Sequence, residues 1–361
     1  MNVVRLTGSV RVVGAGLLGT SVGLALTKAG LDVSIEDASP AVTKLAIDFG
    51  AGRASKTDDS PSLIVVCVPP DVTAKVVADE LNKFPNAVVT DVASVKSAVL
   101  NQLEAQGADL SRYVGSHPMA GRERGGALSG RADLFATRPW VIAPTQMSSA
   151  GAVALVEQLA LDLGAIPSRL SAEEHDQAVA LVSHTPQLVS SLLAARLNNA
   201  ESSQVALAGQ GLRDTTRIAA SDPKLWMQIL GANSSKVSQI LRDFQVDLTK
   251  VIDALENIDA PGSLSALGDA LTRGNQGVEQ IPGKHGAKQQ HFAQVIVMID
   301  DRPGQFAKLL NDIAAADINL EDVSLEHAPG AAVGLVQISV APTRETDLIS
   351  ALENLGWRLA G

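Results

Sequence analysis

The sequence predicts an α/β protein in three parts: a doubly wound parallel sheet, an all-helical domain, and a small βαββαβ domain at the C-terminal end. Up to about residue 168, short β-branched runs alternate with helical segments, the pattern of a parallel sheet covered on both faces. From Ser171 to about residue 258, helical periodicity is almost unbroken. Strand patterns return at Phe292, after a stretch rich in glycine, serine and proline.

The first part contains six candidate strands, each a short run of apolar or β-branched residues. They cover Val10–Val13, Leu31–Glu36, Leu63–Val68, Ala87–Thr90, Tyr113–Ser116 and Trp140–Ala143. A helix is expected over Leu17–Ala29, because its apolar residues have helical spacing and Gly30 follows it.

Two capping signals mark helix starts in the second part. Ser171 is followed three residues later by Glu174, the spacing of a capping box. Asp222 precedes Pro223, an N-cap residue followed by proline at the first helical position. A last helix is expected around Leu264–Leu271, and the glycine-rich residues after it predict a linker.

The third part has the order strand, helix, strand, strand, helix, strand. These elements are Ala293–Ile299, Gln305–Ala315, Asn319–Leu325, Val333–Val340, Glu345–Leu355 and a short strand at Trp357. Pro329–Gly330 predicts the hairpin turn between the two middle strands.

Composition restricts the function classes. The formal net charge of −10 argues against a nucleic-acid partner, which requires a basic face. The single cysteine, Cys67, excludes an intrachain disulfide; we expect it to be buried and unreactive, and we expect no metal site. The apolar stretch Val10–Leu26 is interrupted by four glycines, and no other uninterrupted run is long enough to span a bilayer. We therefore expect a cytoplasmic protein without a membrane partner.

A G-x-G-x-x-G pattern directly follows the first predicted strand and opens the first helix. Gly14 allows the tight turn, and Gly19 permits close packing of helix and strand. Gly16, with Leu17 and Leu18, brings backbone close to a pyrophosphate at the helix N-terminus. In this setting the pattern predicts a Rossmann-type dinucleotide site.

The residues after the second and third strands bear on the coenzyme. The acid that binds the ribose is either Glu36 or Asp37, and we prefer Asp37 because it lies in the turn after the strand. A carboxylate there repels a 2′-phosphate, which favours NAD over NADP. Lys44 or Arg53 would reverse this preference if either reached the same place. Pro69 is a further candidate for the cofactor site; the alternative is that it only ends the strand.

A histidine stands directly after the fifth predicted strand, in the segment Gly115–Gly121 (GSHPMAG). The carboxyl ends of strands in such a sheet face the ligand crevice, and histidine accepts protons near neutral pH. These residues alone leave open whether His117 is a catalytic base or satisfies the backbone of a turn.

Three segments, in this order, resemble prephenate dehydrogenases and their arogenate-using relatives. They are Asp91–Lys96 (DVASVK), Gly115–Gly121, and Gly211–Ala219 (GLRDTTRIA), which Ser221-Asp222-Pro223 and Trp226 follow. The match spans roughly residues 10 to 245. The resemblance implies oxidative decarboxylation of prephenate to 4-hydroxyphenylpyruvate, or of arogenate to tyrosine, with hydride transfer to NAD in tyrosine biosynthesis.

The resemblance also implies residue roles. His117 matches the histidine that accepts the proton of the ring hydroxyl, and Ser94 matches a serine that orients that histidine and the nicotinamide. Arg217 matches the arginine that binds a substrate carboxylate, which suits its two-pronged guanidinium. Glu123 and Asp214 match acids of an ionic network around the site. Trp226 matches an aromatic that reaches the site from the partner subunit, so a homodimer is expected.

One position departs from the prephenate-specific pattern. In Ser183–Gln187 (SHTPQ), prephenate-using relatives often carry a second histidine where this chain has Gln187. His184 and Gln187 lie one helical turn apart, so both can face the crevice. A neutral amide accepts a hydrogen bond from the ammonium group of arogenate, so Gln187 shifts the expectation towards arogenate. The alternative is that Gln187 supports the kink at Pro186 and contacts no substrate.

The segment Asp300–Phe306 (DDRPGQF) resembles the ACT domain, an amino-acid-binding regulatory module of ferredoxin-like fold, over roughly residues 292 to 361. This resemblance implies an aromatic amino-acid effector near Asp301, Pro303 and Gly304, where glycine lets backbone amides approach a carboxylate. The alternative is a domain that only mediates subunit pairing.

The expected boundaries are a dinucleotide-binding domain over residues 1–168, a helical substrate and dimerisation domain over 169–280, a linker over 281–290 and a regulatory domain over 291–361. Two other functions remain open at this point. One is another Rossmann hydroxyacid dehydrogenase with an ACT tail, and the other is a non-catalytic sensor of a dinucleotide and an amino acid.

Overall fold

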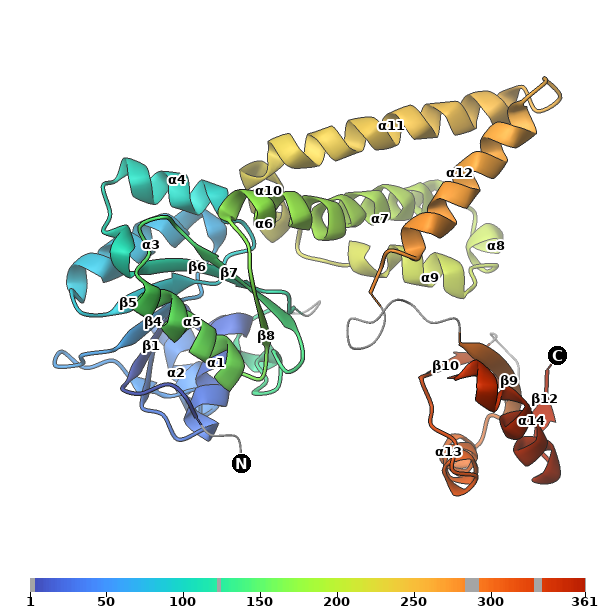
Figure 1. Ribbon diagram of the computed structural model, residues 1–361, viewed down its shortest axis with the longest axis horizontal. Coiled ribbons are helices and arrows are strands. Elements are labelled where there is room, and N and C mark those ends of the chain that lie inside the picture. Colours follow the sequence, from blue (N-terminus) through green and yellow to red (C-terminus); the bar gives the residue numbers. More distant parts are fainter. Residues whose placement is uncertain (1–3, 122–124, 283–291, 328–332, 361) are drawn as a thin grey trace. The chain divides into compact units, whose positions relative to one another are not determined.

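The computed structural model of the chain describes residues 4–121, 125–282, 292–327 and 333–360 (Figure 1). The chain forms two compact units, Met1–Gln245 and Val246–Gly361. The division falls inside one long helix, α11 (Ser234–Glu256).

An eight-stranded sheet forms the centre of the first unit, in the order β3-β2-β1-β4-β5-β6-β7-β8. The strands are β1 (Val10–Val13), β2 (Val33–Glu36), β3 (Arg53–Ala54), β4 (Leu63–Val66), β5 (Val88–Asp91), β6 (Tyr113–Pro118), β7 (Pro139–Pro144) and β8 (Ile166–Arg169). All six predicted strands are present. The two that were not predicted, β3 and β8, are short and mostly exposed, so they carry little hydrophobic pattern.

The strand directions follow the prediction up to β6. Neighbouring strands from β3 to β6 are parallel, whereas β7 runs antiparallel to β6 and β8 is parallel to β7. The prediction of an entirely parallel sheet is therefore wrong at this edge. A parallel connection needs a long crossover, usually a helix. The described part of the link from β6 to β7 holds only the short helix η2 (Ala127–Ser129).

Helices cover both faces of this sheet (Figure 1). On one face lie α1 (Leu17–Lys28), α2 (Pro40–Asp48) and α5 (Ala150–Asp162), and on the other lie α3 (Pro70–Lys83) and α4 (Ser97–Ala105). The side chains of β4 alternate between the two cores: Leu63 and Val65 join the first, and Ile64 and Val66 join the second. The doubly wound architecture expected from the sequence is thus confirmed.

The chain beyond β8 is helical, as predicted. It comprises α6 (Ala172–Val179), the π-helical turn η3 (Ala180–His184), α7 (Thr185–Arg196), η4 (Leu197–Asn199), α8 (Ser202–Val205), α9 (Gln210–Thr216), η5 (Arg217–Ala219), α10 (Pro223–Ala232) and α11. The capping box is present, with Ser171 accepting from the Glu174 amide and Glu174 from the Ser171 amide. Asp222 caps α10 by accepting from the amide of Lys224.

The helical run Ala172–Asn199 is long and apolar enough, by length and composition alone, to cross a membrane. Core helices of soluble proteins meet the same criterion. Here the run carries the buried polar residues Asp176, His184 and Gln187. Their hydrogen bonds to neighbouring elements tie it into the described fold.

The second unit contains the end of α11, then α12 (Ser263–Val278), then an antiparallel sheet. Helix α12 is longer than predicted, because Gly274 and Gly277 lie within it instead of ending it. The sheet order is β10-β11-β9-β12. Its elements are β9 (Ala293–Asp300), α13 (Gln305–Ala315), β10 (Asp322–His327), β11 (Val333–Val340), η7 (Pro342–Arg344), α14 (Glu345–Asn354) and β12 (Arg358–Leu359).

This element order is the one predicted from the sequence. The two helices and the sheet enclose one apolar core that includes Val297, Leu309, Val336 and Leu348. The predicted turn at Pro329–Gly330 and most of the predicted linker lie outside the described residues.

Candidate active site

The glycine-rich loop between β1 and α1 has the geometry that its sequence predicts. Gly14 has φ of +98°, and a Cβ there would lie 2.4 Å from the Cys67 carbonyl oxygen. A Cβ at Gly19 would lie 1.8 Å from the Gly14 carbonyl oxygen. Both positions therefore exclude larger residues. A Cβ at Gly16 would meet nothing within 4 Å, so the backbone entering Leu17 and Leu18 is open to a ligand.

The two acids at the end of β2 take different positions. Oδ2 of Asp37 accepts from the Ala15 amide at 2.9 Å, so this carboxylate lies at the glycine-rich loop. Glu36 pairs with the buried Arg11 at 2.9 Å. The positively charged candidate Arg53 is held by Asp32 and Asp59. These contacts favour Asp37 as the acid that faces a bound ribose.

Two residues that follow β4, Pro69 and Cys67, were singled out by the sequence. Pro69 is exposed and forms the N-cap of α3. Cys67 is half-buried, less than predicted. Burial and the negative charge of Asp91 raise the pKa of its thiol, which keeps it protonated and unreactive, as expected.

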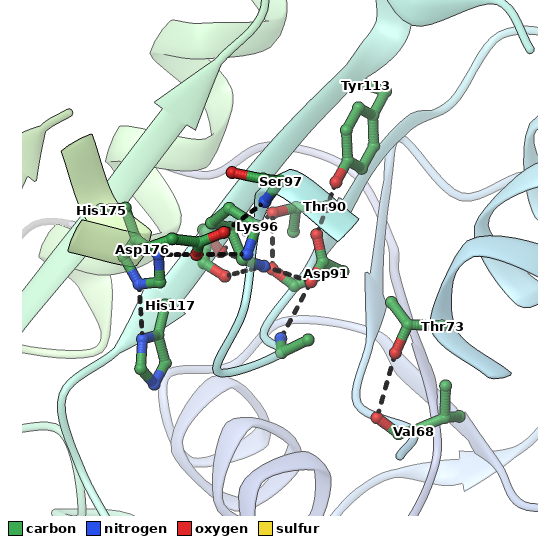
Figure 2. Close-up of polar contacts among 12 residues, drawn as sticks. Val68, Thr73, Thr90, Asp91, Lys96, Ser97, Tyr113, His117, His175 and Asp176 are labelled. Atoms are coloured by element: carbon green, nitrogen blue, oxygen red, sulfur yellow. Dashed lines mark hydrogen bonds and ion pairs between the residues drawn. The ribbon is translucent and has the colours of Figure 1, made fainter. Parts of the chain in front are cut away.

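The core of the candidate site is a line of three side chains (Figure 2). Nδ1 of His117, at the end of β6, lies 2.8 Å from Nε2 of His175. Nδ1 of His175 lies 2.8 Å from Oδ1 of Asp176, on the same helix α6. His175 and Asp176 are fully buried. Sequence reasoning missed both, because they come from a helix 58 residues further along the chain.

When His175 is neutral, this line of contacts fixes which nitrogens carry protons. A carboxylate only accepts, so Nδ1 of His175 must donate to Asp176. Nε2 of a neutral His175 then accepts, so Nδ1 of His117 donates to it. Nε2 of His117 is therefore left with a lone pair, the form that a general base requires.

The electrostatic surroundings keep His117 neutral and Asp176 charged. Burial lowers the pKa of His117 well below its ordinary value, and His175 and Lys96 lower it further. Burial opposes ionisation of Asp176, but hydrogen bonds from His175, Lys96 and Ser97 lower its pKa to about 2. The backbone amides of Lys96 and Ser97 each donate to the Asp176 carboxylate at 2.8 Å.

A buried ion pair lies beside this line (Figure 2). Lys96, 1% exposed, pairs with Asp91 and donates from Nζ to the Ser116 carbonyl oxygen at 2.8 Å. Tyr113 donates to the other Asp91 oxygen at 2.7 Å. These contacts join the ends of β5 and β6, and so they fix the strand end that carries His117.

Ser94 lies between these two strand ends in sequence, yet it is half-buried and makes no hydrogen bond to His117 within the described residues. In the structure, His175 contacts the ring that Ser94 was expected to orient. The role of Ser94 stays a prediction.

His184 is also buried, on the π-helical turn η3. Its Nδ1 lies 3.2 Å from Nδ2 of Asn233, and its ring packs edge-on against Trp226, with centroids 6.0 Å apart. Burial lowers the pKa of His184 to about 4. The expectation for Trp226 was a contact across a dimer; within this chain it contacts His184.

Gln187 lies on the first turn of α7 and is buried. Its Nε2 donates to Oγ of Ser221 at 2.7 Å, just before the start of α10. This contact anchors the loop that precedes α10, while the amide oxygen remains a candidate acceptor for a substrate. Both interpretations of Gln187 therefore stay open.

Asp214 and Arg217 lie on α9 and η5, which pack against α7. Both side chains are exposed, and Asp214 accepts from Gln210 at 2.8 Å. Glu123 lies outside the described residues. Within the described ranges, three or more histidine, cysteine or acidic residues nowhere gather as a metal site would require.

Comparison with known proteins decides the family. Residues 22–167 match the family model described as prephenate dehydrogenase, nucleotide-binding domain, and residues 171–268 match its dimerization domain. A probable prephenate dehydrogenase of Streptomyces niveus, NovF, is 35% identical over 96% of this chain and 98% of its own length. The chain belongs to the prephenate dehydrogenase family.

Other relatives agree with this assignment. The prephenate dehydrogenase of Bacillus subtilis is 25% identical over 93% of this chain and 92% of its own length. The solved prephenate dehydrogenase of A. aeolicus, in complex with hydroxyphenyl propionate and NAD+, aligns with TM-score 0.66 and 25% identity. That alignment covers 75% of this chain and 98% of the other. Membership of this family displaces the hydroxyacid-dehydrogenase alternative.

Proposed function

We propose that this protein oxidatively decarboxylates prephenate or arogenate with NAD, in tyrosine biosynthesis. The observation that carries the proposal is the contact line His117–His175–Asp176, which leaves a proton-accepting nitrogen at a sheet edge. That edge is the carboxyl end of a strand, where ligands of doubly wound sheets bind. Relatives that carry this activity in their names support it.

The glycine-rich loop fits a dinucleotide. Gly16 leaves open space beside the N-terminus of α1, and Asp37 lies where it can accept ribose hydroxyls. NAD, when bound, supplies the acceptor for the hydride. NADP is disfavoured because the Asp37 carboxylate repels a 2′-phosphate.

His117 performs the proton transfer. Its Nε2 removes the proton of the ring hydroxyl while the hydride leaves the carbon that bears this hydroxyl. The oxygen becomes a ketone conjugated with the ring double bonds. The ring carboxylate then leaves as carbon dioxide, its bonding electrons move through the ring onto the ketone oxygen, and the phenolate that forms takes the proton back from His117 to give the phenol. His175 and Asp176 stabilise the protonated His117 that forms.

The other candidate residues bind the substrate. Arg217 takes a carboxylate, and Asp214 and Glu123 complete an ionic network around it. His184, Gln187 and Trp226 would contact the ring and the side chain of the substrate, and Ser94 would help to hold the nicotinamide. These roles rest on the family resemblance and on the packing of α9 and η5 against α7.

Prephenate and arogenate differ in the side chain, where one carries a keto group and the other an ammonium. The neutral amide of Gln187 accepts from an ammonium and favours arogenate. Relatives named for each substrate support both choices: the A. aeolicus enzyme for prephenate and, at TM-score 0.61, a Synechocystis enzyme for arogenate.

The deciding experiment is a rate comparison with two substrates and two coenzymes. We expect NAD reduction with at least one of the two substrates, faster than NADP reduction, and a higher kcat/KM with arogenate. A large preference for prephenate would reject the role of Gln187. Absence of turnover with both substrates would reject the activity and favour the sensor alternative.

We propose a cytoplasmic homodimer formed through the helical region, with boundaries near residues 168, 280 and 290. In the second unit, α11 and α12 expose large apolar residues: Val246, Leu248, Ile252, Leu255, Leu264 and Leu271. A hollow of about 470 Å³ lies between the two helices. Such surfaces are typical of subunit contacts, and the match to a dimerization domain supports this use.

We propose that the C-terminal sheet domain is of the ACT type, with a ferredoxin-like fold. Gly304 has φ of +88° at the N-cap of α13, directly after Asp301 and Pro303. Its backbone is open to a carboxylate such as that of tyrosine. Calorimetric titration with tyrosine and phenylalanine tests this: no heat and no change in rate would leave only a role in subunit pairing.

A further inference from the structure

The turn that carries His184 is built differently from the helices around it. Residues Ala180–His184 form a π-helical turn, in which the Thr185 amide donates to the carbonyl of Ala180, five residues earlier. Pro186 explains this turn. In a regular α-helix its ring would collide with the carbonyl of Val182, and it has no N–H to donate. Wide turns of this kind are frequent at functional sites.

Asn233, at the C-terminal end of α10, sets the hydrogen-bonding state of this histidine. Its Nδ2 donates to the carbonyl oxygen of Asp176 at 2.7 Å, and the same nitrogen lies 3.2 Å from Nδ1 of His184. A carbonyl oxygen only accepts, so the atom facing it must be the amide nitrogen. The second hydrogen of that nitrogen then points to Nδ1 of His184, which must accept it.

A histidine that accepts at Nδ1 carries its proton on Nε2 when neutral. His184 is 1% exposed and Asn233 is 4% exposed, so water does not compete for this bond. The titratable groups that act on His184 are Asp176 and His175 on α6, with His117 on β6. From α10 it contacts the neutral groups of Trp226 and Asn233.

The two active-site histidines thus carry their protons on different ring nitrogens. His117 donates at Nδ1 and keeps a lone pair on Nε2, whereas His184 accepts at Nδ1 and keeps a proton on Nε2. They are close enough for a charge on His184 to lower the pKa of His117. A protonated His184 would therefore weaken the base.

We propose that Asn233 is a positioning residue that fixes His184 as a neutral Nε2–H donor to a substrate oxygen, beside the proton-accepting His117. The proposal rests on the proposed function, because it assigns His184 to the same substrate. It adds a residue outside the recognised motifs and a reason why His184 does not compete with His117 for a proton.

The test uses the full-length protein labelled with ¹⁵N-histidine. Long-range ¹H–¹⁵N spectra identify the tautomer, and the signal that disappears in His184→Gln assigns it. We expect wild-type His184 to show Nε2–H and to stay neutral down to about pH 5, in keeping with its pKa of about 4. An Nδ1–H tautomer in the wild type would overturn the proposal by itself.

Asn233→Asp replaces the donor with an acceptor. We expect His184 to move its proton to Nδ1 and its pKa to rise to about 6.5 or above. KM should rise several-fold at every pH, because Nε2 no longer donates to the substrate, and kcat should fall further as pH drops below the new pKa, where a charged His184 opposes His117. The matched control is Asn198→Asp, the same change at an exposed position of η4, which should leave the His184 tautomer and kcat unchanged.

Asn233→Ala provides a second variant if Asn233→Asp does not fold. It should lose the fixed tautomer and show a rise in KM, because the substrate loses an aligned donor. A folded Asn233 variant with unchanged His184 spectra and unchanged pH profile would contradict the proposal. The spectra do not depend on turnover, so a failure of the proposed function is distinguished from a failure of this inference.

Discussion

The two sheets of this protein use polar residues in opposite ways. At the carboxyl edge of the first sheet, Asp91, Lys96, His175 and Asp176 are all buried and bonded to one another or to backbone. In the C-terminal sheet domain, Ser339 is the buried polar side chain among the described residues, and the rest of the core is apolar.

This difference in buried polar groups reflects the different demands of stability and of catalysis. Burying charges costs solvation energy that a purely structural core avoids, as the C-terminal domain does. The first unit accepts that cost at the buried pair of Arg11 and Glu80 and again at the carboxyl edge of its sheet, where the buried groups surround His117. Buried ion pairs therefore occur in the unit that carries the candidate active site, whereas the described core of the C-terminal sheet domain is apolar.

The largest expected effect comes from His117→Asn. The variant should bind NAD with near wild-type affinity but lose about 10²–10⁴-fold in kcat, because no group remains to accept the hydroxyl proton. Steady-state kinetics and a coenzyme titration measure the two quantities. Near wild-type turnover would show that His117 is not the general base. The buried polar groups around it would then have no catalytic role.

The next effect concerns stability at the same edge. Lys96→Met leaves Asp91 buried without its partner, and we expect a loss of about 3–5 kcal/mol in the free energy of unfolding. Lys308→Met, on helix α13 of the C-terminal domain, is the comparison. It removes an exposed lysine that lies over the ring of Trp357. Chemical denaturation should show a far smaller change there, and equal losses would contradict the contrast.

Most of the fold could be read from the sequence, but less of the site could. Hydrophobic patterns located six of the eight strands of the first sheet and the extent of the helical region, because they survive in a single sequence, but they did not give the bounds of the long helices α3, α5 and α11. The reversal at β7 could not be predicted, because strand direction depends on the connection and not on the strand itself.

The site shows the same limit. His117 stood at a strand end beside proline and glycine, which are local signals. His175 and Asp176 looked like ordinary charged residues of a capped helix, and only the packing of α6 against β6 and α4 gives them a role. The one available signal was an unusual His-Asp pair after the capping box of Ser171.

A third effect depends on pH. The pKa of His184 falls from 6.5 in the unfolded chain to about 4 in the folded protein, and that of His117 is also lowered. As pH falls below 6.5, the unfolded chain takes up these protons first, so the free energy of unfolding decreases between pH 6.5 and about 4. His184 alone contributes about 3 kcal/mol to this decrease.

Denaturation curves at several pH values measure this dependence. His184→Gln should have a shallower decrease than the wild type over the same range. Identical slopes would show that the acid sensitivity arises elsewhere, for instance in the C-terminal domain, and would weaken the contrast between the two sheets.

The smallest effect lies in the C-terminal domain. Gly304→Ala places a side chain at φ of +88° in open space, so only backbone strain opposes it, about 1–2 kcal/mol. Gly268→Ala, inside α12 and also in open space, should stabilise the protein slightly. If Gly304→Ala instead abolished catalysis, the C-terminal domain would be coupled to the reaction far more tightly than its core composition indicates.

The contact between Asp37 and the Ala15 amide has a practical consequence for engineering. Exchange of this acid for serine is an obvious route to accept a phosphorylated coenzyme. Here the same carboxylate also holds the loop amide at 2.9 Å. Such an exchange would loosen the phosphate-binding loop while it removed the repulsion, so a switch of coenzyme needs a second substitution that restores an acceptor for Ala15.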